Sequence, residues 1–208
     1  MDIHPPEGPT RSLKDFAIHI LIVTIGILIA LSLEGIIESV HNHNLVAEAR
    51  VTFHDELESD RQNLNKDLPR VKEVETQVNR LLLDLPKLIK APDQLRKRVA
   101  ALQPSFYFFT DTGWGSVLAS GALTHMKTEE VKRFEEAYIS LRNYQDTQKL
   151  ALPLWIAVDA YYQSHTRYNL QEATEGEEKL RAFQLELQGM EHVGEEFSHD
   201  MNEALAPR

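Results

Sequence analysis

The residues from Phe16 to Ile37 form a long apolar stretch, FAIHILIVTIGILIALSLEGII. Between Phe16 and Leu33 the only ionisable side chain is that of His19. Eighteen helical residues rise about 27 Å, which is close to the hydrocarbon thickness of a bilayer. A helix at the surface of a soluble domain shows polar residues every three or four positions, and this stretch lacks that periodicity. The sequence therefore predicts a transmembrane helix over residues 16–37.

Basic residues on the two sides of this segment predict its orientation. Arg11 and Lys14 precede it, whereas the first basic residue after it is Arg50. Because Lys and Arg resist translocation, the N-terminus is expected to stay in the cytoplasm. Residues 1–15 are then a short cytoplasmic tail, and residues 38–208 form an exported domain. In a bacterium this places the chain in the inner membrane as a single-pass protein with a periplasmic domain.

A cleaved signal peptide is the alternative interpretation of the same segment. The tripeptide Ala30-Leu31-Ser32 offers small residues at a suitable spacing after an apolar region. Apolar character continues beyond this point, through Leu33, Ile36 and Ile37. This continuation favours a retained anchor.

Small and ionisable residues share one stripe of the predicted span. At 100° per residue they fall within about a third of the helix circumference, and they are His19, Gly26, Ala30, Glu34, Glu38 and His41. Gly26 and Ala30 have the small-xxx-small spacing that lets two helices approach closely in lipid. Three interpretations are open: His19 and Glu34 reach toward water at the two ends, the stripe packs on another membrane helix, or His19 is an axial ligand of a haem or pigment.

The rest of the chain shows helical periodicity and no strand pattern. Apolar residues recur at intervals of three or four over residues 45–81, 131–162 and 180–205. Pro69 is expected to kink the first of these helices or to begin a new one, and Pro153 to break or bend the second. The predicted fold class is all-α, with one N-terminal transmembrane helix that continues into an antiparallel helical bundle of four to five helices.

The segments between these helices contain residues that typically begin, end or interrupt helices. The four aromatic residues Phe106 to Phe109 predict an irregular segment that is held in the core. Trp114 opens a short helix that ends at Gly121, a residue suited to the left-handed conformation. Thr128 is expected to cap the next helix, and Asn169 to Gly176 resembles a turn. Gly189 and Gly194 interrupt the pattern of the last helix. We assign structural roles to Trp114 and Gly121.

Several of these motifs together resemble a family of uncharacterised single-span bacterial membrane proteins. The resemblance covers roughly residues 14–145 and includes a Gly- and Leu-rich anchor, an acidic residue, a His-rich stretch, and a tryptophan before a glycine turn. The residues that carry it are the run GILIALSLE from Gly26 to Glu34, then Glu38, His41, His43, Glu48-Ala49-Arg50, Glu56, Trp114, Gly121-Ala122-Leu123, Met126 and Tyr138. The resemblance implies an anchor with a helical exported domain, and it implies no activity.

The charge of the exported part excludes some partners. Beyond Ser39 the chain has 20 basic and 27 acidic residues, a formal charge of about −7. Nucleic acid and anionic lipid are therefore not expected as partners. Residues 61–98 are locally basic and residues 172–203 strongly acidic. Either these two helices lie near one another and offset their charges, or each docks a different neighbour.

No motif for catalysis stands out in the sequence. The chain contains no cysteine, which excludes thiol catalysis, disulfides and thiolate metal sites. Two Glu-x-x-His pairs, Glu38/His41 and Glu196/His199, resemble part of a carboxylate-bridged metal site, but chance alone produces about one such pair in a chain of this composition. The sequence shows no acidic residue that could complete such a site from an apolar helix face. We expect no enzyme activity, metal or cofactor.

Two functional hypotheses remain. In the first, the chain is a non-catalytic accessory subunit whose span packs on other membrane proteins or on a second copy of itself, while its bundle covers the periplasmic face of a larger assembly. In the second, the bundle is a sensor or binding module that signals through a partner, and aromatic side chains line a small-molecule pocket. The candidates for that lining are Phe106 to Phe109, Trp114, Trp155, Tyr161 and Tyr162.

Overall fold

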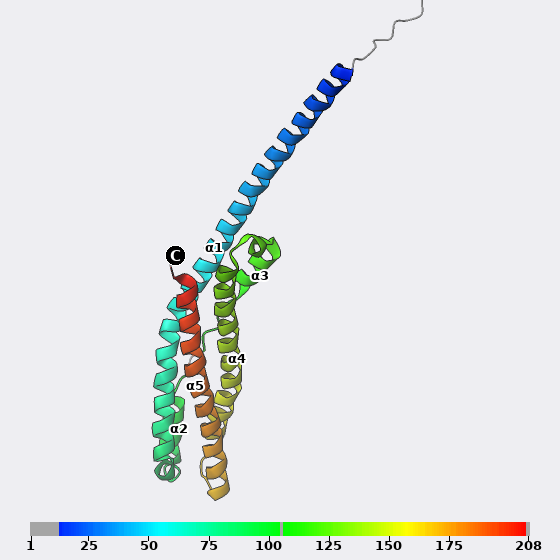
Figure 1. Cartoon of the computed structure of the whole chain (residues 1–208). Coiled ribbons are helices and arrows are strands. Elements are labelled where there is room, and N and C mark those ends of the chain that lie inside the picture. Colours follow the sequence, from blue (N-terminus) through cyan, green and yellow to red (C-terminus); the bar gives the residue numbers. More distant parts are fainter. Residues whose placement is uncertain (1–12, 105, 207–208) are drawn as a thin grey trace, which may run out of the picture. The chain divides into compact units, whose positions relative to one another are not determined.

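The computed structural model of the chain describes residues 13–104 and 106–206 (Figure 1). All regular secondary structure in those residues is helical, which confirms the prediction of an all-α chain. Most of the predicted cytoplasmic tail, residues 1–12, lies outside the described residues. The elements are the α-helices α1 (Leu13–Leu88), α2 (Pro92–Ala100), α3 (Thr112–Ser120), α4 (Thr128–Ser164) and α5 (Leu170–Leu205), with a 3-10 helix η1 (Ala122–His125) after α3.

The chain divides into two units between Ala47 and Glu48. The described part of the first unit is the N-terminal portion of α1 and contains the apolar segment. The second unit contains the remainder of α1 and all the other helices.

Three helices of the second unit bury residues in alternating steps of three and four. This spacing keeps one face of each helix turned toward its neighbours, as in coiled coils and helical bundles. On α1 the buried residues include Ala49, Phe53, Leu57, Asp60, Leu64, Asp67, Val71, Val74, Val78, Leu81, Leu85 and Leu88. On α4 they include Phe134, Ala137, Leu141, Tyr144, Gln148, Ala151, Val158 and Tyr162, and on α5 Leu180, Phe183, Leu187, Met190, Phe197 and Met201.

Contacts along α1 and α4 show that these two helices run in the same direction. The ring of Phe53 lies 4.6 Å from that of Phe134 between centroids. Further along both helices, the hydroxyl of Tyr144 donates to Asp67 over 2.8 Å. Residue numbers therefore increase together in the two helices.

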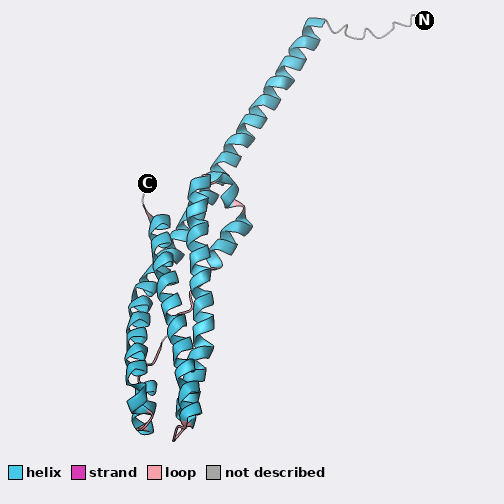
Figure 2. Cartoon of the chain, turned by 60° about the horizontal axis from the view of Figure 1, so that its bottom comes forward, coloured by secondary structure: helices cyan, strands magenta, loops and turns pink. Residues whose placement is uncertain are grey.

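Helix α5 runs in the opposite direction to α1 and lies beside α4 (Figure 2). Lys72 of α1 lies 2.8 Å from Glu195 and 3.2 Å from Glu191 of α5. Asn79, which comes after Lys72 in α1, accepts from Gln184, which comes before Glu191 in α5. The basic part of α1 thus lies against the acidic helix α5, as the first of the two charge interpretations predicted.

Helix α2 folds back along the end of α1 and returns the chain toward the start of the second unit. Arg98 of α2 donates to Asp84 of α1 over 2.6 Å, and Pro92 stands at the first position of α2, where its missing N–H costs nothing. The segment 101–111 continues this return. Because of it, α4 begins beside the early part of the domain and runs parallel to α1.

No helix begins or ends at Pro69 or Pro153, so of the predicted alternatives a new helix at Pro69 and a break at Pro153 are wrong. Helix α1 continues through Pro69 and Pro86, and α4 continues through Pro153. All three prolines are exposed. Proline leaves one helix carbonyl without its usual donor, and on the solvent side this carbonyl can bond to water. The buried contacts on the opposite face then hold each helix together.

The helix starts also differ from two of the sequence predictions. Lys127, not Thr128, is the cap residue of α4, and Thr128 is its first helical residue. The predicted turn at Asn169–Gly176 is helical after Asn169, because this asparagine caps α5 by accepting from the amide of Glu172 over 2.9 Å. Glu172 in turn accepts from the Asn169 amide over 2.7 Å, which completes a capping box.

The two glycines Gly189 and Gly194 do not interrupt α5, and they differ in their surroundings. A Cβ at Gly194 would lie 2.8 Å from Leu68 Cδ1 and 3.0 Å from Tyr144 Cε2, whereas a Cβ at Gly189 would meet nothing within 4 Å. Gly194 therefore lets the fully buried ring of Tyr144 approach the helix backbone.

We predict opposite effects for alanine at these two positions. Gly194→Ala lowers the free energy of unfolding by about 1–3 kcal/mol, because the added methyl group overpacks against Tyr144. Gly189→Ala raises it by about 0.5–1 kcal/mol through helix propensity. Urea denaturation of the two variants and the parent checks this pair. Equal effects of the two substitutions would contradict the packing role of Gly194.

Candidate functional site

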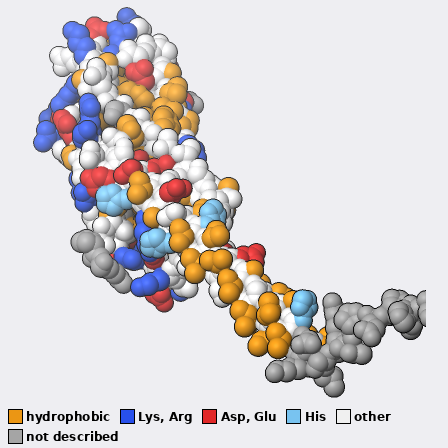
Figure 3. Space-filling model, turned by 90° about the horizontal axis from the view of Figure 1, so that it is seen from above, with side chains coloured by type: hydrophobic (Ala, Val, Ile, Leu, Met, Phe, Trp, Pro, Cys, Tyr) orange, Lys and Arg blue, Asp and Glu red, His pale blue; other side chains and the backbone are white. Residues whose placement is uncertain are grey.

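The four residues predicted for helix packing lie exposed on α1 in the first unit. They are His19, Gly26, Ala30 and Glu34. A Cβ placed on Gly26 meets nothing within 4 Å. Hydrophobic side chains cover the surface of this part of the helix (Figure 3). Within the first unit the stripe is therefore exposed.

Trp114 and Gly121 lie at the two ends of α3. The half-buried ring of Trp114 lies 5.7 Å from Phe53 and 5.6 Å from Tyr138 between centroids. Gly121 ends the helix with φ of +77°, a left-handed conformation that few residues other than glycine adopt, and its amide donates to Leu118 O over 3.2 Å. Trp114 thus packs α3 on α1 and α4, while Gly121 turns the chain toward η1.

Two aspartates are buried in the apolar face of α1, and the sequence analysis missed both. Asp60 is 4% exposed and Asp67 is 3% exposed. Within the described residues, neither aspartate belongs to a group of residues that could hold a metal ion. A signal was present, because both residues continue the alternating spacing of Leu57, Leu64 and Val71.

Asp67 has two hydrogen-bond donors from α4. Tyr144 Oη donates to Asp67 Oδ2 over 2.8 Å, and Gln148 Nε2 donates to the same oxygen over 3.1 Å. Burial raises the pKa of Asp67, while these two hydrogen bonds and the charge of Arg70 act in the opposite direction. The pair of donors compensates part of the cost of burying the carboxyl group.

Asp60 differs because its buried carboxyl oxygen Oδ2 has no hydrogen-bond partner among the described residues. The fully buried hydroxyl of Tyr138 also lacks one there. Burial, and next the charge of Glu56, raises the pKa of Asp60 to about 7. Burial, followed by the charge of Glu56, also raises the pKa of Tyr138. Asp60 is thus poised to change its charge near neutral pH.

Glu56 connects this acidic cluster to α3. Its carboxylate accepts from the amide of Gly113 over 2.9 and 3.2 Å and from Thr112 Oγ1 over 3.0 Å. A Cβ on Gly113 would lie 2.7 Å from Tyr138 Oη and 3.1 Å from both Glu56 carboxylate oxygens. Glycine is required here because the backbone of α3 approaches both side chains closely. We call Glu56, Asp60, Tyr138 and Gly113 the acidic cluster.

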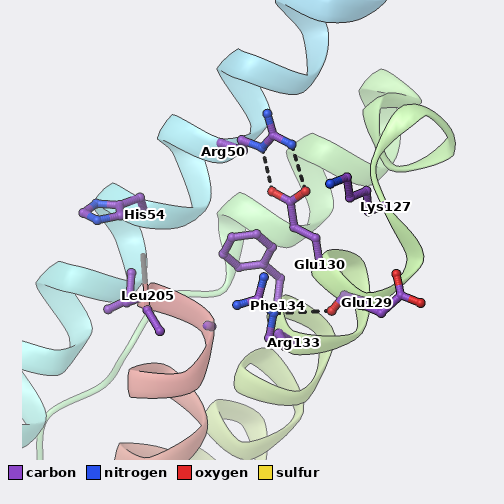
Figure 4. Close-up of a pocket in the computed structure, with 10 residues that line it drawn as sticks. Arg50, His54, Lys127, Glu129, Glu130, Arg133, Phe134 and Leu205 are labelled. Carbon is purple, nitrogen blue, oxygen red and sulfur yellow. Dashed lines mark hydrogen bonds and ion pairs between the residues drawn. The ribbon is translucent and has the colours of Figure 1, made fainter. Parts of the chain in front are cut away.

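A second candidate is a cavity of about 700 Å³ that lies between α1, the start of α4 and the end of α5 (Figure 4). Basic side chains from two helices line it, over an apolar floor that includes Phe134. Its lining residues are Arg50, His54, Lys127, Glu129, Glu130, Arg133, Phe134, Ala204, Leu205 and Ala206.

Two of the arginines that line this cavity are held by contacts within the protein. Arg50 binds Glu130 through two hydrogen bonds of 2.6 and 2.8 Å, and these bonds lower the pKa of Glu130. Arg133 donates to the backbone carbonyls of Glu203 and Glu129 over 3.2 and 3.4 Å. The contacts of these lining side chains therefore link α1, α4 and α5. The lining contains no nucleophile next to a base.

The residues of the two Glu-x-x-His pairs are exposed, and the pairs lie on different helices. Glu38 and His41 belong to α1, and Glu196 and His199 to α5. In the part of the chain that the structure describes, no group of three or more His, Asp or Glu side chains is arranged to hold a metal ion.

Comparison with known proteins adds no relative to this picture. No family model matches the chain, and no curated protein or solved structure matches it. The resemblance to single-span membrane proteins stays a prediction, as does the absence of enzyme activity. The exposed apolar segment and the acidic cluster are therefore the two features of the molecule that bear on its function.

We predict that Asp60 makes the stability of the domain fall as pH rises. The folded chain holds the Asp60 proton up to a pKa of about 7, against an ordinary value of 3.8. Between these values the folded state binds more protons, so the free energy of unfolding decreases with pH and levels off above pH 7. Asp60→Asn removes this decrease and is more stable than the parent at pH 8 by about 2–4 kcal/mol.

Urea denaturation at about pH 5 and pH 8 checks this prediction. The control is Asp55→Asn, which removes an exposed carboxylate from the same helix. The control is expected to keep the pH dependence of the parent. If Asp60→Asn also keeps it, Asp60 does not titrate near neutral pH.

Alanine substitution in α3 tests the close approach at Gly113. Gly113→Ala is expected to lower the free energy of unfolding by about 1–3 kcal/mol, because Tyr138 is too tightly packed to move away. Gly115→Ala, two residues later, meets nothing within 4 Å and raises it by up to about 1 kcal/mol. Thermal unfolding of the two variants measures the difference, and similar melting temperatures would refute the requirement for glycine.

Proposed function

We propose that the chain is a non-catalytic, membrane-anchored interaction subunit. Residues 16–37 cross the inner membrane with the N-terminus in the cytoplasm, and the span packs on other membrane helices. The part that follows is a periplasmic helical bundle that covers the exported face of a larger membrane assembly. The observation that carries the proposal is the exposed apolar surface of the first unit.

This surface is too apolar for contact with water. The most apolar 18-residue window of α1 has a mean hydropathy of 2.6, and none of it is buried. Large apolar side chains from Phe16 to Val40 are about half exposed or more. Leaving such a side chain in water instead of an apolar environment costs about 1 kcal/mol or more, and monomeric soluble proteins rarely expose such a continuous patch. A bilayer removes this cost.

Two other origins of such a helix fit less well. A core helix of a soluble domain is mostly buried, whereas this segment is not. A signal peptide would end near Ala30-Leu31-Ser32, but apolar residues continue beyond this point through Leu33, Ile36 and Ile37. Both observations favour a retained anchor, and the basic residues before the span support the orientation.

The stripe on the span supports a partner within the membrane. Gly26 and Ala30 leave the helix backbone accessible, and the space beside Gly26 is open. Helices in lipid associate through close backbone approach at small residues. The occupant can be another membrane protein or a second copy of the chain.

Six of the eight aromatic residues considered for a ligand pocket contact other aromatic side chains. Trp155 lies 5.6 Å from Phe183, and Tyr161 lies 4.3 Å from His165, between ring centroids. Trp114 packs on Phe53 and Tyr138. These contacts resemble core packing more than the walls of a pocket, so they favour the interaction subunit over the small-molecule sensor.

The proposal predicts a side-specific effect of bulk on the span. Gly26→Leu fills the open space on the stripe and is expected to release the chain from its complex while it stays in the membrane. Thr24→Leu adds bulk about 160° away on the same helix and is expected to leave the complex intact. The measurement is the mass of the full-length protein extracted from its own membrane in mild detergent.

The outcomes separate the two parts of the proposal. Complexes that survive Gly26→Leu rule out packing through the stripe. A parent chain that is found only in the soluble fraction rules out the anchor. A parent that is membrane-bound but always monomeric rules out the interaction subunit.

A further inference from the structure

We propose that α3 is a pH-controlled latch, which is docked on α1 while Asp60 carries its proton and detaches when Asp60 ionises. The latch is the segment Thr112–Ser120, and its fastening point is Glu56. This inference rests on the acidic cluster of the second unit and is independent of the function of the span.

The fastening of α3 is local and small. Only the amide of Gly113 and the hydroxyl of Thr112 bond to Glu56, and the ring of Trp114 packs on Phe53. Of the nine residues of α3, only Gly113 and Val117 are buried. Segments with few buried contacts open at a low free-energy cost. Loss of the Glu56 contacts therefore removes a large share of what holds α3.

Asp60 lies where its charge acts on this fastening. On a helix, residues four apart are neighbours on one face, so Asp60 lies beside Glu56. From α4 the cluster includes the buried hydroxyl of Tyr138, on which the charge of Glu56 acts, and from the segment before α3 the carboxylate of Asp111 acts on the same hydroxyl. These groups are acidic or neutral.

The nearby arginines are paired with other carboxylates. Arg142 of α4 lies 3.9 Å from Asp111 Oδ2. Arg61, next to Asp60 in sequence, forms an ion pair with Glu58 at 2.6 Å. At this end of α5 the buried residues are Met201 and Ala204, and the carboxylate of Asp200 accepts from Ser140 of α4. An ionised Asp60 is thus a buried negative charge beside the half-buried Glu56, and neither carboxylate forms an ion pair among the described residues.

Ionisation of Asp60 therefore creates repulsion that one movement relieves. Two carboxylates in a low-dielectric site cannot both ionise without cost. Rotation of Glu56 toward solvent separates the charges, because Glu56 is only half-buried, but this movement breaks its bonds to Gly113 and Thr112. Burial and the charge of Glu56 raise the pKa of Asp60 to about 7, which places the transition near neutral pH.

The left-handed turn at the end of α3 marks where the latch hinges. Gly121 has φ of +77°, and a Cβ there would meet nothing within 4 Å. Glycine leaves this position free to change conformation without a side-chain clash. Detachment of α3 uncovers the faces of Phe53 and Tyr138 on which Trp114 packs.

Tryptophan fluorescence tests the latch directly. The chain has two tryptophans, Trp114 and Trp155, so Trp155→Phe leaves Trp114 as the single reporter. In the full-length protein in detergent micelles, acrylamide quenching of Trp114 is expected to rise about twofold or more between about pH 5.5 and pH 8.5. Asp60→Asn in the same background is expected to stay at the low value throughout.

Two controls separate the latch from general effects of pH. Asp55→Asn removes an exposed carboxylate of α1 and is expected to keep the transition. Glu56→Gln keeps an acceptor oxygen but removes the repelling charge, so the ionisation of Asp60 is expected to move to lower pH and the rise in quenching to weaken. Far-UV circular dichroism over the same range is expected to stay constant.

Three results would overturn the proposal. These are constant quenching of Trp114 across the pH range, an unchanged transition in Asp60→Asn, and a loss of helical signal that accompanies the rise in quenching. The last result means that the domain unfolds as a whole and that α3 does not detach separately.

Discussion

The alternating three- and four-residue spacing of buried side chains is the constraint on which the second unit depends. It extends along α1, α4 and α5 and keeps a continuous face of each helix in the interior. Helices with this repeat pack at small angles, with side chains of one fitting between those of the next. The spacing also fixes the register of α1 against α4. Phe53 meets Phe134 in the same register in which Asp67, further along α1, meets Tyr144. Prolines inside α1 and α4 are tolerated because the buried face of each helix is uninterrupted.

Much of the fold could be predicted from the sequence because hydrophobic periodicity is a local signal. The all-α class follows from the spacing of apolar residues, the apolar segment from its lack of polar residues, and the end of α3 from the glycine at position 121. The breaks at Pro69 and Pro153 were predicted from the local cost of proline, about 3 kcal/mol in a helix interior. Both prolines face solvent, and buried neighbours on the other side of each helix outweigh that cost. Local rules do not include this contribution of tertiary packing.

The acidic cluster could not be predicted in the same way, because it depends on contacts between distant residues. Asp60 and Asp67 fit the buried spacing, but a carboxylate is normally taken to mark the solvent face of a helix. Their burial becomes visible only when α4 supplies Tyr138 and Tyr144 and the returning segment supplies Gly113. The opposite holds for the stripe on the predicted span. Its residues were found from the sequence, and their role in helix packing stays a prediction.

The two buried aspartates occupy equivalent positions one heptad apart, yet their surroundings assign them different roles. Asp67 receives two hydrogen bonds from α4, and any slip between α1 and α4 would leave it buried without donors. Such a penalty favours one register of the two helices. Asp60 lacks that compensation and has Glu56 beside it, so its charged form is disfavoured in the folded state. A sequence optimised only for stability would place an apolar residue at position 60, as at positions 57 and 64. The cost of Asp60 therefore makes it the residue of the core whose charge state most directly affects the docking of α3.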